Sequence, residues 1–202
     1  QIQYNWQNST EGWVSGGNCN LTAQPDAMAM RVFSSNAVMR SGNLQANLGI
    51  NGGDYNQVQV MIKNPTSGSA VARLFLYPPG TNTAACYYTF QVGTAMTGFS
   101  TYTISLDSLP SGGSSTVYTG PIARFGLRAP WGGVNFDTIF WKQMIISNTN
   151  QVIDSVNITF NVDMSQVNES FTTPELNGTF NSWCGNCNAM SDSDGDNIWD
   201  VT

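Results

Sequence analysis

The chain has 202 residues and a formal net charge of −6, and its apolar fraction of 41% is sufficient for hydrophobic cores, which excludes a disordered chain. Only 10% of the residues are charged, against roughly a quarter in an average soluble domain. The chain contains no histidine, which excludes Ser-His and Cys-His nucleophile systems and histidine-ligated zinc.

The charges are unevenly spread along the chain. Residues 1–150 hold all seven lysines and arginines against five acids, and the remaining residues hold eight acids and no base. No stretch of the sequence forms the basic stripe that phosphate neutralisation requires, so we expect no nucleic-acid binding. Asn, Gln, Ser, Thr and Gly take the place of surface charges, and a surface of this kind favours neutral partners such as carbohydrates.

Short alternating segments broken by Gly, Pro, Asn and Ser fill the first 150 residues. Within 55–63, Val58, Val60 and Ile62 share one face, as in a half-buried strand. The predicted strands are 27–32, 55–63, 71–77, 87–92, 99–104, 122–127 and 138–146. No segment of about twelve or more residues has a helical period, so the sequence predicts an all-β fold, a β-sandwich of the jelly-roll kind.

The order of features in this region resembles a jelly-roll carbohydrate-binding module. The features are an opening Glu11-Gly12-Trp13, strand 55–60 leading to Lys63, and the segments 99–106, 122–128 and 135–139. The resemblance implies a core position for Trp13 and a share in a structural calcium site for Asp137. The chain has Ala129-Pro130 where the family usually has Asp-Pro, so the family's site residues do not transfer directly.

Sugar binding needs flat aromatic faces and forked polar groups, and we expect both on loops or on an exposed sheet face. Trp131, between Pro130 and two glycines, is the first candidate, with Arg128 beside it; the alternative is a ring folded back onto its own sheet. Tyr77 precedes Pro78-Pro79-Gly80 and is predicted to be a loop-edge aromatic. Three further expectations concern aromatic residues: Tyr55 on a face, one of Tyr87 and Tyr88 pointing outward, and Trp6 and Trp141 in the core or in packing between modules.

We expect no enzyme active site. A glycosidase needs two carboxylates facing one cleft, and each acid of the first 150 residues lies in a turn or at a strand edge. Ser108 and Ser155 each follow an aspartate and precede an apolar residue, which resembles the O-glycosylation sites of exported Bacteroidetes proteins.

The segment Trp183-Cys184-Gly185-Asn186-Cys187 is similar to a thioredoxin active site, but the residues after it have turn composition and no helical period. A disulfide between Cys184 and Cys187 is therefore expected in place of redox catalysis. The cysteine count is four, which allows three pairings, and we expect Cys19 to pair with Cys86. An even cysteine number and a start at Gln1 favour a secreted or cell-surface protein, and no apolar stretch approaches the roughly 18 residues of a membrane span.

Alternating acids near the end of the sequence are candidate ligands for calcium, which prefers carboxylate oxygens. They are Asp192, Asp194, Asp196 and Asp200. Their register is not that of an EF-hand, because Gly195 precedes the third aspartate. The alternative is a solvated hairpin turn that needs no metal.

Residues 156–202 resemble the first half of an immunoglobulin-like starch-binding or glycogen-binding sandwich of secreted Bacteroidetes proteins. The motifs that carry the resemblance are 158–164, 177–183 and 194–199. In that family the matching Trp stacks on a sugar, which implies this role for Trp183; the alternative is that Trp183 covers the adjacent disulfide. A whole sandwich of this kind needs about 100 residues, so we expect an incomplete module.

The boundary is predicted within 148–151, which gives a jelly-roll domain over 1–150 and a partial immunoglobulin-like sandwich over 151–202. We expect a non-catalytic glycan-binding segment of a larger secreted or surface protein, whose partners are polysaccharides or oligosaccharides and other surface modules. Two alternatives stay open: a structural stalk or adhesin module, and the accessory modules of a polysaccharide hydrolase.

Overall fold

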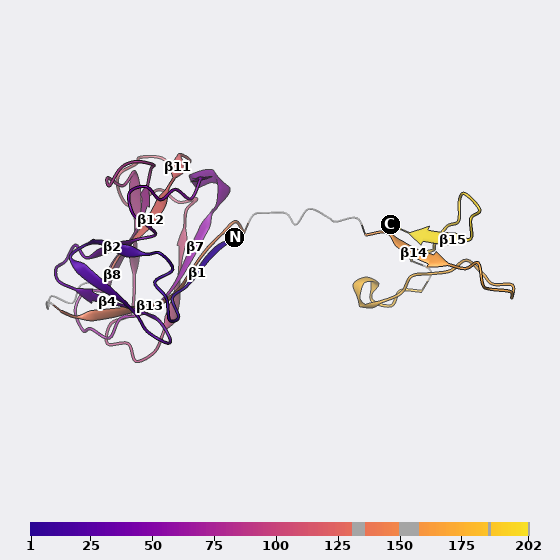
Figure 1. The fold of residues 1–202 in the computed structure, drawn as a ribbon, viewed down its shortest axis with the longest axis horizontal. Helices are drawn as coiled ribbons and strands as arrows, with labels where there is room; N and C mark the ends of the chain where they lie inside the picture. Colours follow the sequence, from indigo (N-terminus) through magenta and orange to yellow (C-terminus); the bar gives the residue numbers. More distant parts are fainter. Residues whose placement is uncertain (131–135, 150–157, 186, 202) are drawn as a thin grey trace. The chain divides into compact units, whose positions relative to one another are not determined.

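The computed structural model describes residues 1–130, 136–149, 158–185 and 187–201. The chain divides into two compact units, Gln1–Gln151 and Val152–Thr202. Both units are all-β apart from two short 3-10 turns among the described residues, η1 (Gly52–Asp54) and η2 (Thr179–Asn181). Figure 1 shows the first unit in indigo to orange and the second in orange to yellow.

Two antiparallel sheets build the first unit (Figure 1). The six-stranded sheet has the order β10-β7-β13-β4-β3, with β1 beside β13; its strands are β1 (Ile2–Asn5), β3 (Cys19–Ala23), β4 (Met28–Val32), β7 (Gln57–Lys63), β10 (Ser100–Ser105) and β13 (Thr138–Ser147). The five-stranded sheet has the order β2-β5-β12-β8-β9 and consists of β2 (Val14–Gly17), β5 (Val38–Arg40), β8 (Val71–Tyr77), β9 (Cys86–Gln91) and β12 (Arg124–Arg128). A short pair, β6 (Ile50–Asn51) and β11 (Pro121–Ile122), completes the unit.

A single hydrophobic core lies between the two sheets. Its members come from alternate positions of strands in both sheets, such as Val58 and Val60 of β7 and Leu74 and Leu76 of β8, because successive side chains of a strand point to opposite faces. The three tryptophans assigned to packing, Trp6, Trp13 and Trp141, are all buried in this core. The predicted β-sandwich is therefore the observed fold, and every predicted strand of the first unit coincides with an observed one.

The second unit contains one antiparallel pair of strands, β14 (Phe160–Asp163) and β15 (Ile198–Val201), among its described residues. Met190 is buried, whereas Phe180 and Trp183 are exposed. The immunoglobulin-like sandwich predicted for this part of the chain stays an expectation.

Across the residues that the structure describes, no helix is long and apolar enough to cross a membrane.

Candidate functional site

The outer face of the five-stranded sheet carries arginine and aromatic side chains from four strands. In β8, Leu74 and Leu76 are in the core, so Arg73, Phe75 and Tyr77 lie on the opposite face of the sheet. The cross-strand pairs on this face are Arg73 with Arg128, Tyr77 with Arg124, Phe75 with Gly126 and Tyr87, and Gly126 with Arg40. We call the set Arg40, Arg73, Phe75, Tyr77, Tyr87, Arg124 and Arg128 the arginine face.

Guanidinium groups of the arginine face lie over its aromatic rings. The Arg73 guanidinium carbon is 4.5 Å from the centroid of Tyr87. Those of Arg40 and Arg124 are 5.0 Å and 5.3 Å from the centroid of Tyr77. A cation–π contact holds the guanidinium through its face and leaves the N–H donors at its edge for other partners. The aromatic rings therefore position the arginines without using their hydrogen-bonding capacity.

Tyr77 is not the exposed loop-edge aromatic that the sequence predicts. Its side chain is only 4% exposed, because Arg40 and Arg124 lie over its ring. Space for the ring comes from Gly126, where a Cβ atom would approach Tyr77 Cε2 to 2.7 Å. Tyr77 is thus a support for two arginines and offers little surface to a sugar.

Arg124 connects the arginine face to the loop between β8 and β9. Its guanidinium donates hydrogen bonds to Asn82 Oδ1 at 3.2 and 3.3 Å and to the main-chain oxygen of Thr81, and the residue is 1% exposed. Burial lowers the pKa of Arg124, and the positive charge of Arg40 lowers it further. Arg124 is therefore a structural member of the face.

Arg128, a predicted site residue, lies on this face directly opposite Arg73. Both side chains are half-buried, and burial followed by the charge of Arg73 lowers the pKa of Arg128. The structure thus brings Arg128 together with Tyr77 on one sheet, as members of a larger set that includes residues outside the sequence prediction: Arg40, Arg73 and Phe75. The alternation of Arg73, Phe75 and Tyr77 within one strand is the signal in the sequence that marks this face.

Tyr87 is the outward-pointing member of the Tyr87-Tyr88 pair, as predicted for one of the two. Tyr88 is buried at 3% exposure, and its hydroxyl donates to the main-chain oxygen of Leu106 at 3.2 Å. Tyr87 is half-buried, and its ring centroid is 5.6 Å from that of Phe75. Phe75 and Tyr87 are therefore adjacent half-buried rings, and the Arg73 guanidinium and Gly112 lie against that of Tyr87.

A polar cleft of about 670 Å³ lies elsewhere on the first unit. It is lined by Gln1, Gly53, Asp54, Tyr55, Ser147 and Asn148. One carboxylate oxygen of Asp54 already accepts a hydrogen bond from the Asn51 main-chain nitrogen at 2.7 Å. Tyr55 is the one aromatic among the described residues of this lining, whereas the arginine face has three.

Two predicted site residues lie outside the described residues, namely Trp131 and Ser155. Ser108 is exposed, and its hydroxyl donates to the main-chain oxygen of Ser105 at 2.7 Å. Glycosylation of Ser108 stays a prediction.

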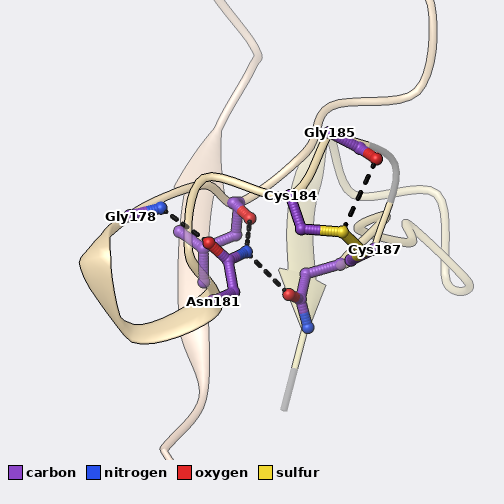
Figure 2. The surroundings of a disulfide bond; sticks show 7 residues. Gly178, Asn181, Cys184, Gly185 and Cys187 are labelled. Atoms are coloured by element: carbon purple, nitrogen blue, oxygen red, sulfur yellow. Dashed lines mark hydrogen bonds between the residues drawn. A yellow bond between two sulfur atoms is a disulfide. The ribbon is translucent and has the colours of Figure 1, made fainter.

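The predicted disulfide between Cys184 and Cys187 is present (Figure 2). Asn181 organises the turn before it: its side chain accepts a hydrogen bond from the Gly178 main-chain nitrogen and donates to Asn188 Oδ1, both at 2.9 Å. Trp183 has a left-handed backbone (φ 57°), and 70% of its side chain is exposed. The sugar-stacking role of Trp183 and the alternative in which it covers the disulfide both stay predictions.

The predicted pairing of Cys19 with Cys86 is wrong, because both are free, buried thiols. Cys19 lies on β3, the edge strand that is next to β2, whereas Cys86 lies on β9, the edge strand next to β10. The two cysteines are thus at opposite sides of the sandwich, and no disulfide can span that separation.

Three clustered acidic residues of the second unit lie in one turn. Carboxylate oxygens of Asp192, Asp194 and Asp196 lie within 4.8 Å of one another. The Asp192 carboxylate accepts hydrogen bonds from the main-chain nitrogens of Gly195, Asp196 and Asn197 at 2.8, 3.1 and 3.1 Å. The two other candidate ligands are not in this group: Asp200 belongs to β15, and Asp137 precedes β13 in the first unit. The three clustered carboxylates suit a hard cation, and calcium binding stays a prediction.

No family model matches this sequence, and no curated protein matches it. Among solved structures it is similar to a carbohydrate-binding module, BiXyn10A CBM1 in the apo form, with 9% identity over 73% of this chain and 97% of that one and a TM-score of 0.48. A low-affinity xylan-binding module, CBM86 from Roseburia intestinalis, is 14% identical over 73% of this chain and 96% of that one, with a TM-score of 0.44. The adhesin domain of Lys-gingipain from Porphyromonas gingivalis is 9% identical over 73% of this chain and 98% of that one, with a TM-score of 0.46. Similarity at this level does not bear on the ligand of this chain.

Proposed function

We propose that this chain is a non-catalytic glycan-binding segment of a secreted or cell-surface protein, and that the arginine face is its binding site. The observation that carries the proposal is the pair of half-buried rings Phe75 and Tyr87, which lie on one sheet face with Arg73 and Arg128, two arginines without a hydrogen-bond partner among the described residues.

The chemistry of this face suits a sugar. A pyranose presents a C–H surface that packs against aromatic rings, and its ring hydroxyls accept hydrogen bonds from N–H donors placed at the edge of that surface. Phe75 and Tyr87 supply the rings, and Arg73 and Arg128 supply forked donors. The strands hold these side chains in place, which lowers the entropy lost on binding.

Two carboxylates of the first unit have local structural contacts. Glu11 accepts a hydrogen bond from the Asn5 main-chain nitrogen at 2.9 Å, and Asp54 accepts one from Asn51 at 2.7 Å. Contacts of this kind are typical of turn residues and support a binding role over hydrolysis, which needs two carboxylates facing the scissile bond.

For the second unit we propose an accessory role in binding, with Trp183 as a sugar platform. The exposure of 70% supports this role, since a stacking ring must be accessible. Origin in a Bacteroidetes surface protein is part of the same proposal, and a role as accessory modules of a polysaccharide hydrolase stays an alternative to it.

Affinity electrophoresis of the full chain in gels that contain one polysaccharide each tests the proposed function. We expect at least one polysaccharide to retard the chain, and Phe75→Ala with Tyr87→Ala to abolish the retardation. Phe140→Ala is the matched control, because Phe140 is a half-buried aromatic on β13 of the other sheet. A chain that no polysaccharide retards would favour the stalk or adhesin role, and loss of retardation in Phe140→Ala alone would move the site to the other sheet.

A further inference from the structure

The arginine face brings together positive charges that are far apart in the sequence. Four of the arginines in the chain, at positions 40, 73, 124 and 128, come from β5, β8 and β12 and lie on one face. Arg73 and Arg128 are direct cross-strand neighbours. Like charges directly opposite each other destabilise an antiparallel pair, so the fold does not gain from this arrangement.

The strands of this sheet contribute no compensating acid. All five acids of residues 1–150 are described by the structure, and none belongs to β2, β5, β8, β9 or β12. The Nε atoms of Arg40, Arg73, Arg124 and Arg128 are buried without a hydrogen-bond partner among the described residues. A buried polar group without a partner is costly, so the fold gains no stability from these four Nε–H groups.

The aromatic rings hold these arginines in a form that is ready to bind. Arg73 is held over Tyr87 and Arg40 over Tyr77 by contacts to their faces. Their Nε atoms are buried, so the terminal Nη groups of these half-buried residues are the donors left for other partners. A guanidinium edge presents parallel N–H donors that match the two oxygens of a carboxylate or sulfate. A neutral hydroxyl would use one such donor and leave the charge uncompensated.

The rest of the chain does not attract polyanions in general. The net charge is −6, and the residues after 150 contribute eight acids and no base. Attraction of an anion therefore requires a local site, and the arginine face supplies one.

We propose that the arginine face binds an acidic glycan, with Arg73 and Arg128 on the oxyanion of a uronate or sulfated sugar and Phe75 and Tyr87 against its ring. This inference rests on the proposed function and specifies its ligand class. It revises the expectation of neutral partners, because that expectation treated the arginines as separate surface charges.

The first test compares two forms of one polysaccharide. Full chain is titrated with polygalacturonate and with its methyl-esterified form, which has the same backbone without the charge. We expect the acidic form to bind at least about tenfold more tightly, because charge-assisted hydrogen bonds are roughly twice as strong as neutral ones. Dextran sulfate against dextran forms the second arm, and the arm with the larger ratio identifies carboxylate or sulfate as the preferred oxyanion.

The variants locate the site. Arg73→Gln combined with Arg128→Gln should lower the affinity for the acidic form about tenfold or more, with an unchanged or higher melting temperature because the repulsion is removed. Lys142→Gln on β13 of the other sheet is the control for loss of positive charge, with an expected change below about twofold. Arg73→Lys combined with Arg128→Lys keeps the charge without the fork and should recover only part of the affinity.

Failure of the acidic-ligand proposal and failure of the glycan-binding proposal give different results in these experiments. Equal affinity for the acidic and esterified forms would overturn the acidic ligand and keep glycan binding. No binding to any polysaccharide would overturn both proposals. Tighter binding of oligothymidylate than of any glycan, lost in the Arg73→Gln and Arg128→Gln double variant, would reassign the face to nucleic acid and also overturn both.

Discussion

Arg73 of β8 and Arg128 of β12 are direct cross-strand partners whose side chains share the outer face of the five-stranded sheet. A pair of like charges at this position costs stability, and no acid on the strands of this sheet offsets it. Such a cost is typical of a binding site, where groups are arranged for a ligand and not for the fold alone.

Removing one member of this pair should therefore stabilise the protein. We expect Arg128→Gln to raise the free energy of unfolding by about 0.2–1 kcal/mol at low salt, and the gain should shrink in high salt, which screens the repulsion. Urea denaturation at two ionic strengths measures both effects. A loss of stability at low salt would mean that the packing of the Arg128 stem outweighs the repulsion.

Gly126 should be essential to the arrangement of the arginine face. In Gly126→Ala the new Cβ would lie 2.7 Å from Tyr77 Cε2, so the ring must move and the guanidinium groups of Arg40 and Arg124 lose their support. We expect a loss of about 1–3 kcal/mol in stability and weaker binding of the acidic glycan. Gly98→Ala is the control, because nothing lies within 4 Å of its Cβ, and a cost as large there would contradict the steric explanation.

Non-reducing mass spectrometry should find Cys184 linked to Cys187 and should find Cys19 and Cys86 as free thiols. Burial raises the pKa of Cys86 from 9.0 to about 11 and that of Tyr88 from 10.0 to about 12. Both groups are neutral when protonated, so the unfolded chain releases their protons at lower pH than the folded chain does. Their contribution to stability is complete below about pH 9 and is lost as the pH rises towards 12.

Guanidinium denaturation between pH 7 and 12 checks this pH dependence. The free energy of unfolding should fall from about pH 9 upward, and Cys86→Ala should reduce the fall between about pH 9 and 11. A thiol reagent should label Cys86 slowly in native protein at pH 8, since the thiolate is the reactive form. Rapid labelling in native protein would contradict the burial of Cys86.

Trp183→Ala should change stability by less than about 0.5 kcal/mol, because the side chain is 70% exposed. Trp199→Ala is the control. The Trp199 ring packs edge-to-face against Phe171 with 5.9 Å between the centroids, so this substitution should lower the free energy of unfolding by more than Trp183→Ala does. If Trp183 is a sugar platform, its loss also weakens retardation in a starch gel. If starch retards the parent chain and the Trp183→Ala variant equally, Trp183 has no role in starch binding.

Calcium at Asp192, Asp194 and Asp196 should raise the melting temperature, because a ligand that binds only the folded state stabilises it. Chelator should reverse the gain, and Asp194→Asn with Asp196→Asn should abolish it, while the main-chain hydrogen bonds of Asp192 maintain the turn. A melting curve that is insensitive to calcium and chelator would leave these aspartates as turn residues.

The strands of the first unit were predictable because their signal is local. Apolar residues alternate with other residues along 55–63 and 71–77 because one face of each strand packs on the core. Both segments are strands with alternately buried residues. The short strands β1, β2, β3 and β5 were not predicted. Gly16 and Gly17 in β2 and the three-residue length of β5 give little alternation, and β1 and β3 alternate over only four and five residues. The outward position of one tyrosine of the Tyr87-Tyr88 pair followed from the same period of two.

The composition of the arginine face and the separation of the two free thiols depend on strand order, and no local sequence pattern predicts strand order. Cys19 and Cys86 are separated because their strands lie on edges at opposite sides of the sandwich. Tyr77 precedes a proline-rich loop in the sequence, yet the glycine opposite Phe75 on β12 leaves room for its ring to lie under two arginines. Composition and alternation by themselves determined that the chain is all-β, and they favoured a sugar-binding role. Only the pairing of β12 with β5 and β8 decided that arginines from distant segments gather on one face, because lateral register is set by long-range hydrogen bonds and core packing.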